Sequence, residues 1–273
     1  MKRIYFFLVF LLTVAGFAQQ PHVAEIESEE LWTSRDSLRI YGRLYRPAGC
    51  QGRLPLLVLA HGFGANHEVV EPYAEAMARR GFLCYIFDFC GGSRVSRSDG
   101  RTDHMSAFTE RADLQSILAQ LRRRSDVDTT RVVLLGESQG GLVSAMTAAE
   151  CAPLVSRLVL LYPAFNIPFD AVRRFPRPED MPETYDIWGM HLGRVYGACF
   201  YGYDVWADIV RYAGPTLILH GNRDRVVPAR YGLEAAARYR DAQFHTIAGS
   251  DHGFHGADFD AAMAYISAFL GQQ

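Results

Sequence analysis

Lysine is almost absent from this chain of 273 residues, because Lys2 is the single one and every other strongly basic side chain is an arginine. Schiff-base catalysis, Ser-Lys dyads and phosphate-binding loops of the Walker type all require a side-chain amine. Beyond residue 2 the chain has no such amine. These three chemistries are therefore excluded.

An excess of positive charge is missing as well. The chain has 28 Lys and Arg against 30 Asp and Glu, a net charge of -2 at pH 7. This balance predicts no basic surface for nucleic acid, so we expect no nucleic-acid partner. With 49% hydrophobic and 21% charged residues, the composition is that of one globular domain with a large core.

Long apolar runs are lacking except at the N-terminus, where residues 4–15 follow the positively charged start Met1-Lys2-Arg3. The run ends in small residues at Gly16-Phe17-Ala18, which predicts a signal peptide over residues 1–18, cleaved after Ala18. An uncleaved membrane anchor is the alternative, but the run is shorter than the ~20 residues that span a bilayer. We expect an exported protein, periplasmic or secreted, without stable membrane insertion after cleavage.

Cysteine is scarce, and its five copies fit no metal-binding spacing. An odd number leaves at least one thiol free, while the exported location permits disulfides. Whether any pair is bonded stays open. The cysteines are Cys50, Cys84, Cys90, Cys151 and Cys199.

Continuous apolar runs alternate with helical patterns along most of the chain. An alternating pattern at 38–45 predicts an antiparallel strand, and later runs predict buried strands at 54–60, 82–87, 131–135, 158–162, 216–220 and 243–247. Helices are predicted at 69–80, 105–124, 139–150 and 229–240. This order indicates an α/β class protein with a mainly parallel sheet and helices on both faces.

One connection is too long for a simple crossover. Residues 162–206 hold five of the twelve prolines and eleven of the aromatic residues. Such a composition favours an inserted cap, at about 163–205, that packs over a pocket and supplies apolar contacts to a ligand. An insertion that merely packs on itself is the alternative.

The segment Gly136-Glu137-Ser138-Gln139-Gly140 lies between a predicted strand and a predicted helix. A serine on such a tight turn needs neighbours without side-chain bulk, and the two glycines meet that need. It resembles the Gly-x-Ser-x-Gly nucleophile elbow of the α/β-hydrolases. The resemblance makes Ser138 the candidate nucleophile and implies the α/β-hydrolase fold for residues 19–273.

A serine nucleophile needs a base and a group that orients the base. In the α/β-hydrolases the acid and the histidine follow in that order after late strands. The segment 220–228, His-Gly-Asn-Arg-Asp-Arg-Val-Val-Pro, resembles the family's His-Gly-x-x-Asp-x-x-Val-Pro motif, with Asp224 as the acid. The segment 249–254, Gly-Ser-Asp-His-Gly-Phe, resembles its Gly-x-x-His-Gly-Phe motif, with His252 as the base.

Other histidines and carboxylates compete for these roles. Asp251 adjoins His252 but neighbouring loop side chains seldom face each other, and Glu137 in the elbow should point away from the serine. The competing histidines are His67, His104, His191, His220, His245 and His255.

Two backbone N–H groups should stabilise the oxyanion of an acyl-transfer intermediate. Gln139, next to the nucleophile, offers one, and the resemblance of His61-Gly62-Phe63-Gly64 to the family's His-Gly turn implies Phe63 for the other. The loop at 87–99 resembles the family's Asp-x-Arg-Gly-x-Gly-x-Ser turn, but Cys90 stands at the arginine position. We expect this loop to border the pocket without chemistry of its own.

Within the superfamily the motifs look most like cinnamoyl and feruloyl esterases and their monoacylglycerol-lipase and serine-aminopeptidase relatives. They imply a serine carboxylesterase acting on short-acyl or aromatic esters of small molecules, with no cofactor and no metal. Alternatives are a monoacylglycerol lipase-like enzyme, an aminopeptidase-like or acyl-peptide hydrolase in which Glu183, Asp186 or Asp204 of the cap holds an amine, and a silent binding protein. The oligomeric state is not predicted.

Overall fold

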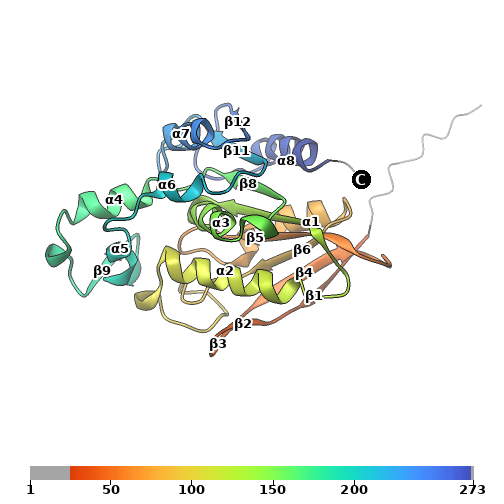
Figure 1. The fold of residues 1–273 in the computed structure, drawn as a ribbon, viewed down its shortest axis with the longest axis horizontal. Coiled ribbons are helices and arrows are strands. Elements are labelled where there is room, and N and C mark those ends of the chain that lie inside the picture. The colour runs from red at the N-terminus through yellow and green to blue at the C-terminus, as the bar shows by residue number, and fades with distance from the viewer. Residues whose placement is uncertain (1–24, 272–273) are drawn as a thin grey trace, which may run out of the picture.

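Strands and helices alternate through the computed structural model, which describes residues 25–271 (Figure 1). The predicted signal peptide and its cleavage site lie outside the described residues and stay predictions, as does export. The strands are β1 (Ile26–Glu30), β2 (Thr33–Arg35), β3 (Leu38–Ile40), β4 (Gly42–Pro47), β5 (Leu54–Ala60), β6 (Leu83–Phe87), β7 (Val127–Glu137), β8 (Arg157–Leu161), β9 (Thr184–Ile187), β10 (Met190–Gly193), β11 (Thr216–Gly221) and β12 (Ala242–Ile247).

The α-helices lie mainly in the connections between these strands. They are α1 (Glu71–Ala78), α2 (Ala107–Leu121), α3 (Ser138–Glu150), α4 (Ile167–Arg174), α5 (Val195–Ala198), α6 (Val205–Ile209), α7 (Arg230–Arg238) and α8 (Ala257–Leu270). Short 3₁₀ helices are η1 (His67–Val69), η2 (Thr102–His104), η3 (Ala152–Leu154) and η4 (Pro178–Asp180).

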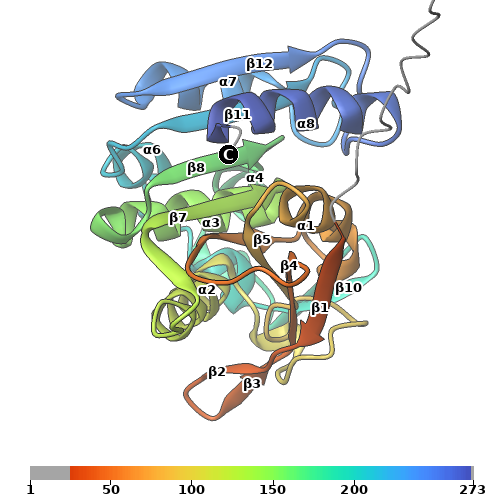
Figure 2. The same cartoon turned by 90° about the vertical axis from the view of Figure 1, so that its right-hand side faces the viewer.

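Eight strands form one sheet in the order β1-β4-β6-β5-β7-β8-β11-β12. The pairs β1–β4 and β4–β6 are antiparallel, whereas the pairs from β6 through β12 are parallel. The predicted α/β class with a mainly parallel sheet is confirmed. Figure 2 shows this sheet with α8 crossing in front of it.

Both faces of the sheet are covered, which explains the continuous apolar runs of the central strands. All seven residues of β5 and all five of β6 are buried, as parallel strands between two helix layers require. One core cluster joins the sheet to α2, α3, α6 and α7, and the other joins it to α1 and α8.

The strand predicted at 38–45 is wrong as a single element. It is divided at Tyr41 into β3, which pairs with β2 in a separate hairpin, and β4, which joins the main sheet. At the division the Tyr41 N–H donates to Ser98 Oγ at 2.8 Å instead of to a neighbouring strand. Gly42 then passes so close to Tyr85 that a Cβ would lie 2.2 Å from the phenol oxygen.

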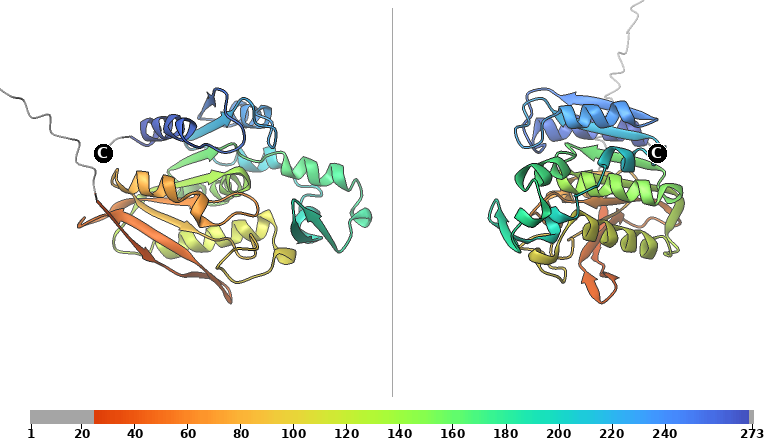
Figure 3. Two further views of the ribbon diagram at one scale, coloured as in Figure 1. Left: turned by 180° about the vertical axis from the view of Figure 1, so that it is seen from behind. Right: turned by 60° about the vertical axis from the view of Figure 1, so that its left-hand side comes forward.

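The segment between β8 and α6 leaves the sheet at the carboxyl ends of the parallel strands. It contains α4, η4, the hairpin β9–β10 and α5. Both Figure 1 and the rear view in Figure 3 show this segment to one side of the sheet. We call residues 163–205 the cap.

All five cysteines lie within the described residues, and each is a free thiol. None of the helices between residues 25 and 271 combines the length and apolarity needed to cross a bilayer.

Candidate active site

Ser138 is the first residue of α3 and follows the last residue of β7 directly. Its φ of 50° is a left-handed conformation that non-glycine residues rarely adopt. The flanking glycines permit this turn: a Cβ on Gly136 would lie 2.2 Å from the Gly140 carbonyl oxygen, and one on Gly140 would lie 2.3 Å from the Ala60 oxygen. The strained turn lifts the serine above the end of the sheet.

Ser138, His252 and Asp224 form a hydrogen-bonded chain. The Ser138 Oγ lies 3.0 Å from His252 Nε2, and His252 Nδ1 lies 2.8 Å from Asp224 Oδ2. Ser138 follows β7 directly at the start of α3, whereas His252 and Asp224 lie in the loops after β12 and β11, and these three strands end at the same edge of the sheet. This is the geometry in which an imidazole can take a proton from a serine hydroxyl while a carboxylate fixes its tautomer.

Asp224 is held as a carboxylate by the loop around it. Its Oδ1 accepts hydrogen bonds from the N–H groups of Val226 and Val227 at 2.9 and 2.8 Å. Although burial acts to raise the pKa of Asp224, hydrogen bonds from His220, His252 and Val227 outweigh burial and hold that pKa well below its usual range. Asp224 is therefore ionised at neutral pH.

His220 is a neighbour of Asp224 that the sequence argument set aside as a competitor. Its ring is fully buried, and its Nε2 lies 2.8 Å from the Val227 carbonyl oxygen and 3.3 Å from Asp224 Oδ2. His220 therefore stabilises the loop that carries Asp224. The sequence spacing of four residues could have predicted this contact, because the turn after β11 brings His220 and Asp224 together.

The other competitors lie apart from the hydrogen-bonded chain. Asp251 accepts backbone N–H bonds from Arg225 and His252 at 3.3 and 2.9 Å, so it shapes the turn. His67 is paired with the buried Asp88 at 2.7 Å. His255 lines the groove beside Ser138 but makes no hydrogen bond to it.

The two predicted oxyanion donors flank Ser138. A Cβ on Gly62 would lie 3.2 Å from the Ser138 Cβ, so the loop that carries Phe63 packs against Ser138. Among residues 25–271 the Phe63 N–H has no hydrogen-bond acceptor. Gln139 is the second residue of α3, where backbone N–H groups have no acceptor in the helix. Both N–H groups thus remain the predicted donors.

Behind the hydrogen-bonded chain lies a buried carboxyl group. Glu137 accepts a hydrogen bond from the Tyr162 hydroxyl at 2.7 Å and one from the Gly62 N–H at 3.4 Å, and burial raises its pKa. The ring of Tyr162 meets that of His252 edge-on, with centroids 4.8 Å apart. This contact positions the imidazole of His252. The sequence motifs did not predict it.

The side chain of Gln139 connects helix α3 to the cap. Its Nε2 donates to Glu110 Oε2 on α2 at 2.8 Å, and its Oε1 accepts from the Tyr196 hydroxyl on α5 at 2.7 Å. Complete burial raises the pKa of Glu110 to about 8, with the nearby Asp113 adding to the effect and the bond from Gln139 opposing it. The side chain of the predicted oxyanion residue is thereby fixed from both sides.

We expect Glu110→Gln to gain stability over the unsubstituted protein as the pH rises from 5 to 8. In the folded state Glu110 keeps its proton to about pH 8, whereas a glutamate in the unfolded chain loses it near pH 4.5. Between these values the folded state binds more protons, so rising pH lowers the free energy of unfolding by up to about 1.4 kcal/mol per pH unit. Glutamine keeps an acceptor for Gln139 and has no proton to lose.

Urea unfolding at each pH measures this difference. The exposed Glu234 of α7, paired with Arg238, provides the control Glu234→Gln, which removes a carboxyl group without burial. A stability difference that stays constant from pH 5 to 8 for Glu110→Gln would contradict the prediction.

The expectation that the loop at 87–99 borders the pocket is wrong, because no residue of it lines either cavity beside Ser138. The Cys90 N–H donates to Asp113 Oδ2 at 2.9 Å, which ties the loop to α2. Asp88 accepts from the N–H groups of His67 and Arg97 at 2.7 Å each. Burial raises the pKa of the Cys90 thiol, which is therefore protonated.

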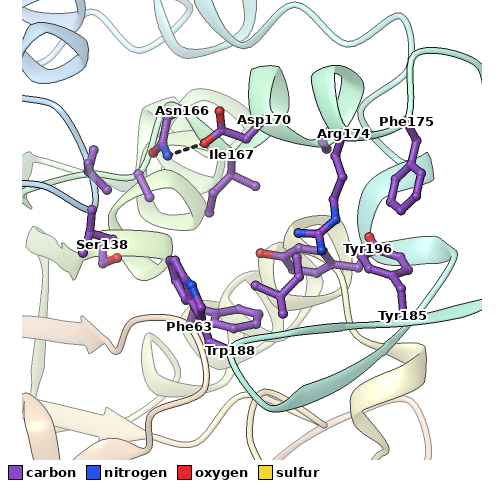
Figure 4. Close-up of a pocket in the computed structure, with 15 residues that line it drawn as sticks. Phe63, Ser138, Asn166, Ile167, Asp170, Arg174, Phe175, Tyr185, Trp188 and Tyr196 are labelled. Atoms are coloured by element: carbon purple, nitrogen blue, oxygen red, sulfur yellow. Dashed lines mark hydrogen bonds between the residues drawn. The ribbon is translucent and has the colours of Figure 1, made fainter.

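Two cavities meet at Ser138. One, of about 180 Å³, lies between Ser138 and the cap (Figure 4) and is lined by aromatic residues that include Phe63, Phe175 and Tyr185. The other is a wider groove of about 720 Å³ on the side of His252. Trp188, at the tip of the β9–β10 hairpin, lines both and is 78% exposed. We call them the cap cavity and the histidine-side groove.

The cap carboxylates considered as amine ligands lie outside both cavities. Asp204 caps the N-terminus of α6, Glu183 forms an exposed ion pair with Arg194 at 3.1 Å, and Asp186 lies 3.4 Å from His191. Among residues 25–271, no three His, Cys, Asp or Glu side chains form a cluster that could hold a metal ion.

Comparison with known proteins agrees with this architecture. The family described as "Serine aminopeptidase, S33" matches residues 53–181, a little under half of the chain. Among solved structures, Est1E from Butyrivibrio proteoclasticus with bound ferulic acid superposes with a TM-score of 0.82 at 24% identity, covering 89% of this chain and 98% of that one. The α/β hydrolase domain-containing protein 10 from mouse gives a TM-score of 0.70 at 19% identity, covering 89% and 98%.

Curated relatives match over shorter stretches. The quorum-quenching protein AidA of Acinetobacter baumannii is 30% identical over 109 residues, 39% of this chain and 34% of AidA. The acylamino-acid-releasing enzyme of Sus scrofa is 24% identical over 201 residues, 67% of this chain and 26% of that enzyme. The chain thus spans about a third or less of these relatives. Together the comparisons confirm the α/β-hydrolase fold and the predicted resemblance.

Proposed function

We propose that this α/β-hydrolase is a serine carboxylesterase that transfers the acyl group of small-molecule esters to Ser138 and then to water. The observation behind the proposal is the hydrogen-bonded chain from Ser138 through His252 to Asp224. An acyl-serine mechanism needs each of these contacts, and the strained elbow exposes the serine to a substrate.

The proposed reaction has two halves. His252 Nε2 takes the hydroxyl proton as Ser138 Oγ attacks the ester carbonyl, and the N–H groups of Phe63 and Gln139 stabilise the oxyanion. The imidazolium returns the proton to the leaving alcohol as the carbon–oxygen bond breaks. Water, activated by the same imidazole, then hydrolyses the acyl-serine.

The two cavities separate the two parts of the ester. The leaving alcohol must receive its proton from His252, so it occupies the histidine-side groove, which His252 lines. The acyl group then extends the other way, into the cap cavity. The aromatic lining of that cavity suits an aromatic acyl group, since ring pairs gain about 0.5–1.5 kcal/mol beyond burial. The structural likeness to Est1E with bound ferulic acid is consistent with this choice.

Cleavage of acyl-peptide or aminoacyl bonds is the second candidate. The match to the serine aminopeptidase family and the partial identity to the acylamino-acid-releasing enzyme favour it. The side chain of Glu68 lines the histidine-side groove, where an amine leaving group would lie.

A substrate panel tests the proposal. The purified protein is incubated with p-nitrophenyl acyl esters, methyl hydroxycinnamates and aminoacyl or acyl-peptide amides, and intact mass is recorded alongside product release. We expect ester turnover with a mass increase of one acyl group. Turnover of amides with inert esters would instead establish the peptidase candidate, and neither turnover nor acylation of any compound would reject both.

A further inference from the structure

Arg174 brings a positive charge into the cap cavity. It is the last residue of α4, and its guanidinium extends into the cavity at the end away from Ser138 (Figure 4). The rings of Phe175 and Tyr185 each lie 5.9 Å from its Cζ. At this distance both rings attract the cation and favour its present orientation.

This charge differs from those of the other cap arginines, each of which forms an ion pair. Among residues 25–271, Arg174 forms none, and its hydrogen bonding is limited to the Asp186 carbonyl oxygen at 3.5 Å. The paired arginines are Arg173 with Asp170, Arg177 with Asp180, and Arg194 with Glu183.

Asp170, the carboxylate that shares the cap cavity, forms no ion pair with Arg174 among the described residues. Asp170 accepts a hydrogen bond from Asn166 Nδ2 at 2.7 Å and pairs with Arg173. The guanidinium therefore faces the cavity with most of its donors free. A guanidinium presents parallel N–H groups that match a carboxylate in a bidentate pair, and such charge-assisted bonds are among the strongest in proteins.

The cavity has a gradient of polarity from one end to the other. Between Ser138 and Arg174 the lining includes the apolar Phe63 and Ile167, with Asn166 and Asp170 along one wall, and the guanidinium comes at the end away from Ser138. Arg174 is an exposed residue, so beside a fully apolar acyl group its guanidinium would stay hydrated and would gain no charged partner. An acyl group with an apolar body and an anionic tip would satisfy both parts of the cavity.

We infer that the preferred acyl groups end in a carboxylate that Arg174 binds, as in hemiesters of dicarboxylic acids and carboxyl-substituted aryl acids. The inference rests on the proposed esterase function and narrows its substrate class. A phenolic hydroxyl at the same place would accept a hydrogen bond from the guanidinium but would lack the opposite charge and the second oxygen that a bidentate pair requires.

Matched methyl esters test the inference, with kcat and KM followed by product release. Methyl 4-carboxycinnamate, methyl 4-hydroxycinnamate and methyl 4-methylcinnamate differ only at the tip, and monomethyl suberate is compared with methyl octanoate. Because Arg174 is exposed, we expect the carboxylated member of each set to have a kcat/KM about two- to five-fold above its methyl counterpart, mainly through a lower KM. Salt at 1 M should reduce this preference.

Substitutions locate the effect at one residue. Arg174→Gln should remove the preference for the carboxylate while turnover of the neutral esters persists, and Arg174→Lys should keep part of the preference. Arg177→Gln is the control, because Arg177 is an exposed cap arginine outside the cavity.

Three results would overturn the inference. Equal kcat/KM for the carboxylated and methyl esters, or a carboxylate preference that survives in Arg174→Gln, would show that Arg174 does not select the acyl group. The highest kcat/KM for the hydroxylated ester would assign the far end to a phenol. Inertness of all five esters and of the p-nitrophenyl esters would reject the esterase proposal itself. Turnover of the neutral esters without a carboxylate preference would reject the carboxylate inference alone.

Discussion

Ser138→Ala is expected to abolish acyl transfer and to lower kcat by about a million-fold, the scale measured when the nucleophile of a serine hydrolase is removed. Without Oγ there is no atom to accept the acyl group, and the imidazole of His252 loses its partner at 3.0 Å. Alanine can occupy the same left-handed turn at no greater cost than serine, so the fold should persist. Intact-mass spectrometry after ester incubation, together with the rate of product release, measures the effect.

The matched control for this substitution is Ser144→Ala. Ser144 lies on the same helix, is fully buried, and its hydroxyl has no hydrogen-bond partner among residues 25–271. Removing it should leave acylation intact. If Ser138→Ala retained a mass increase of one acyl group, the nucleophile would be another residue and the proposed mechanism would fail.

Asp224→Asn is expected to lower kcat at pH 7 by about a thousand- to ten-thousand-fold. An amide at this position can donate an N–H to His252 Nδ1, which then acts as an acceptor. The ring proton consequently moves to Nε2, the nitrogen that faces Ser138, and the base loses its lone pair. Steady-state kinetics on the best ester of the panel measure the loss, with circular dichroism to verify the fold.

The same substitution carries a stability signature. Because the folded-state pKa of Asp224 is depressed, this group stabilises the fold above the pKa of an unfolded-chain aspartate, about 3.9, and the contribution disappears as the pH falls through the folded value. Asp224→Asn should therefore lose less stability than the unsubstituted protein on acidification below pH 4. Asp251→Asn is the control, since Asp251 is exposed and only shapes the turn; an equal kinetic loss there would shift the role of the acid away from Asp224.

The central strands could be predicted because burial on both faces dictates their composition. The run at 54–60 is β5 residue for residue, and α3 begins one residue before its predicted start. The first part of β7 gave no such signal, because residues 128–131 are polar and partly or fully exposed. The edge strand β1 was missed since four of its five residues are exposed and lack the apolar pattern.

The hydrogen-bonded chain could be predicted for a different reason. Short motifs fix the local turn, and the parallel sheet brings the ends of β7, β11 and β12 to one edge, so residues 114 positions apart meet. The supporting contacts could not be predicted. The sequence places Glu110 in a helix, Tyr162 at the end of a strand and Tyr196 in the cap. Only the packing of these elements brings Glu110 and Tyr196 next to Gln139. The same packing brings Tyr162 next to His252.

The cap joins the sheet between β8 and β11, two strands that are neighbours and pair in register. Ser138, Asp224 and His252 follow β7, β11 and β12, so all three lie outside the cap. The cap contributes the wall of the cavity that lies away from Ser138. On the proposed esterase function, mutations confined to residues 163–205 would alter which acyl groups are accepted while Ser138, His252 and Asp224 keep their contacts with one another. New substrates become reachable through changes in a single contiguous stretch of the gene.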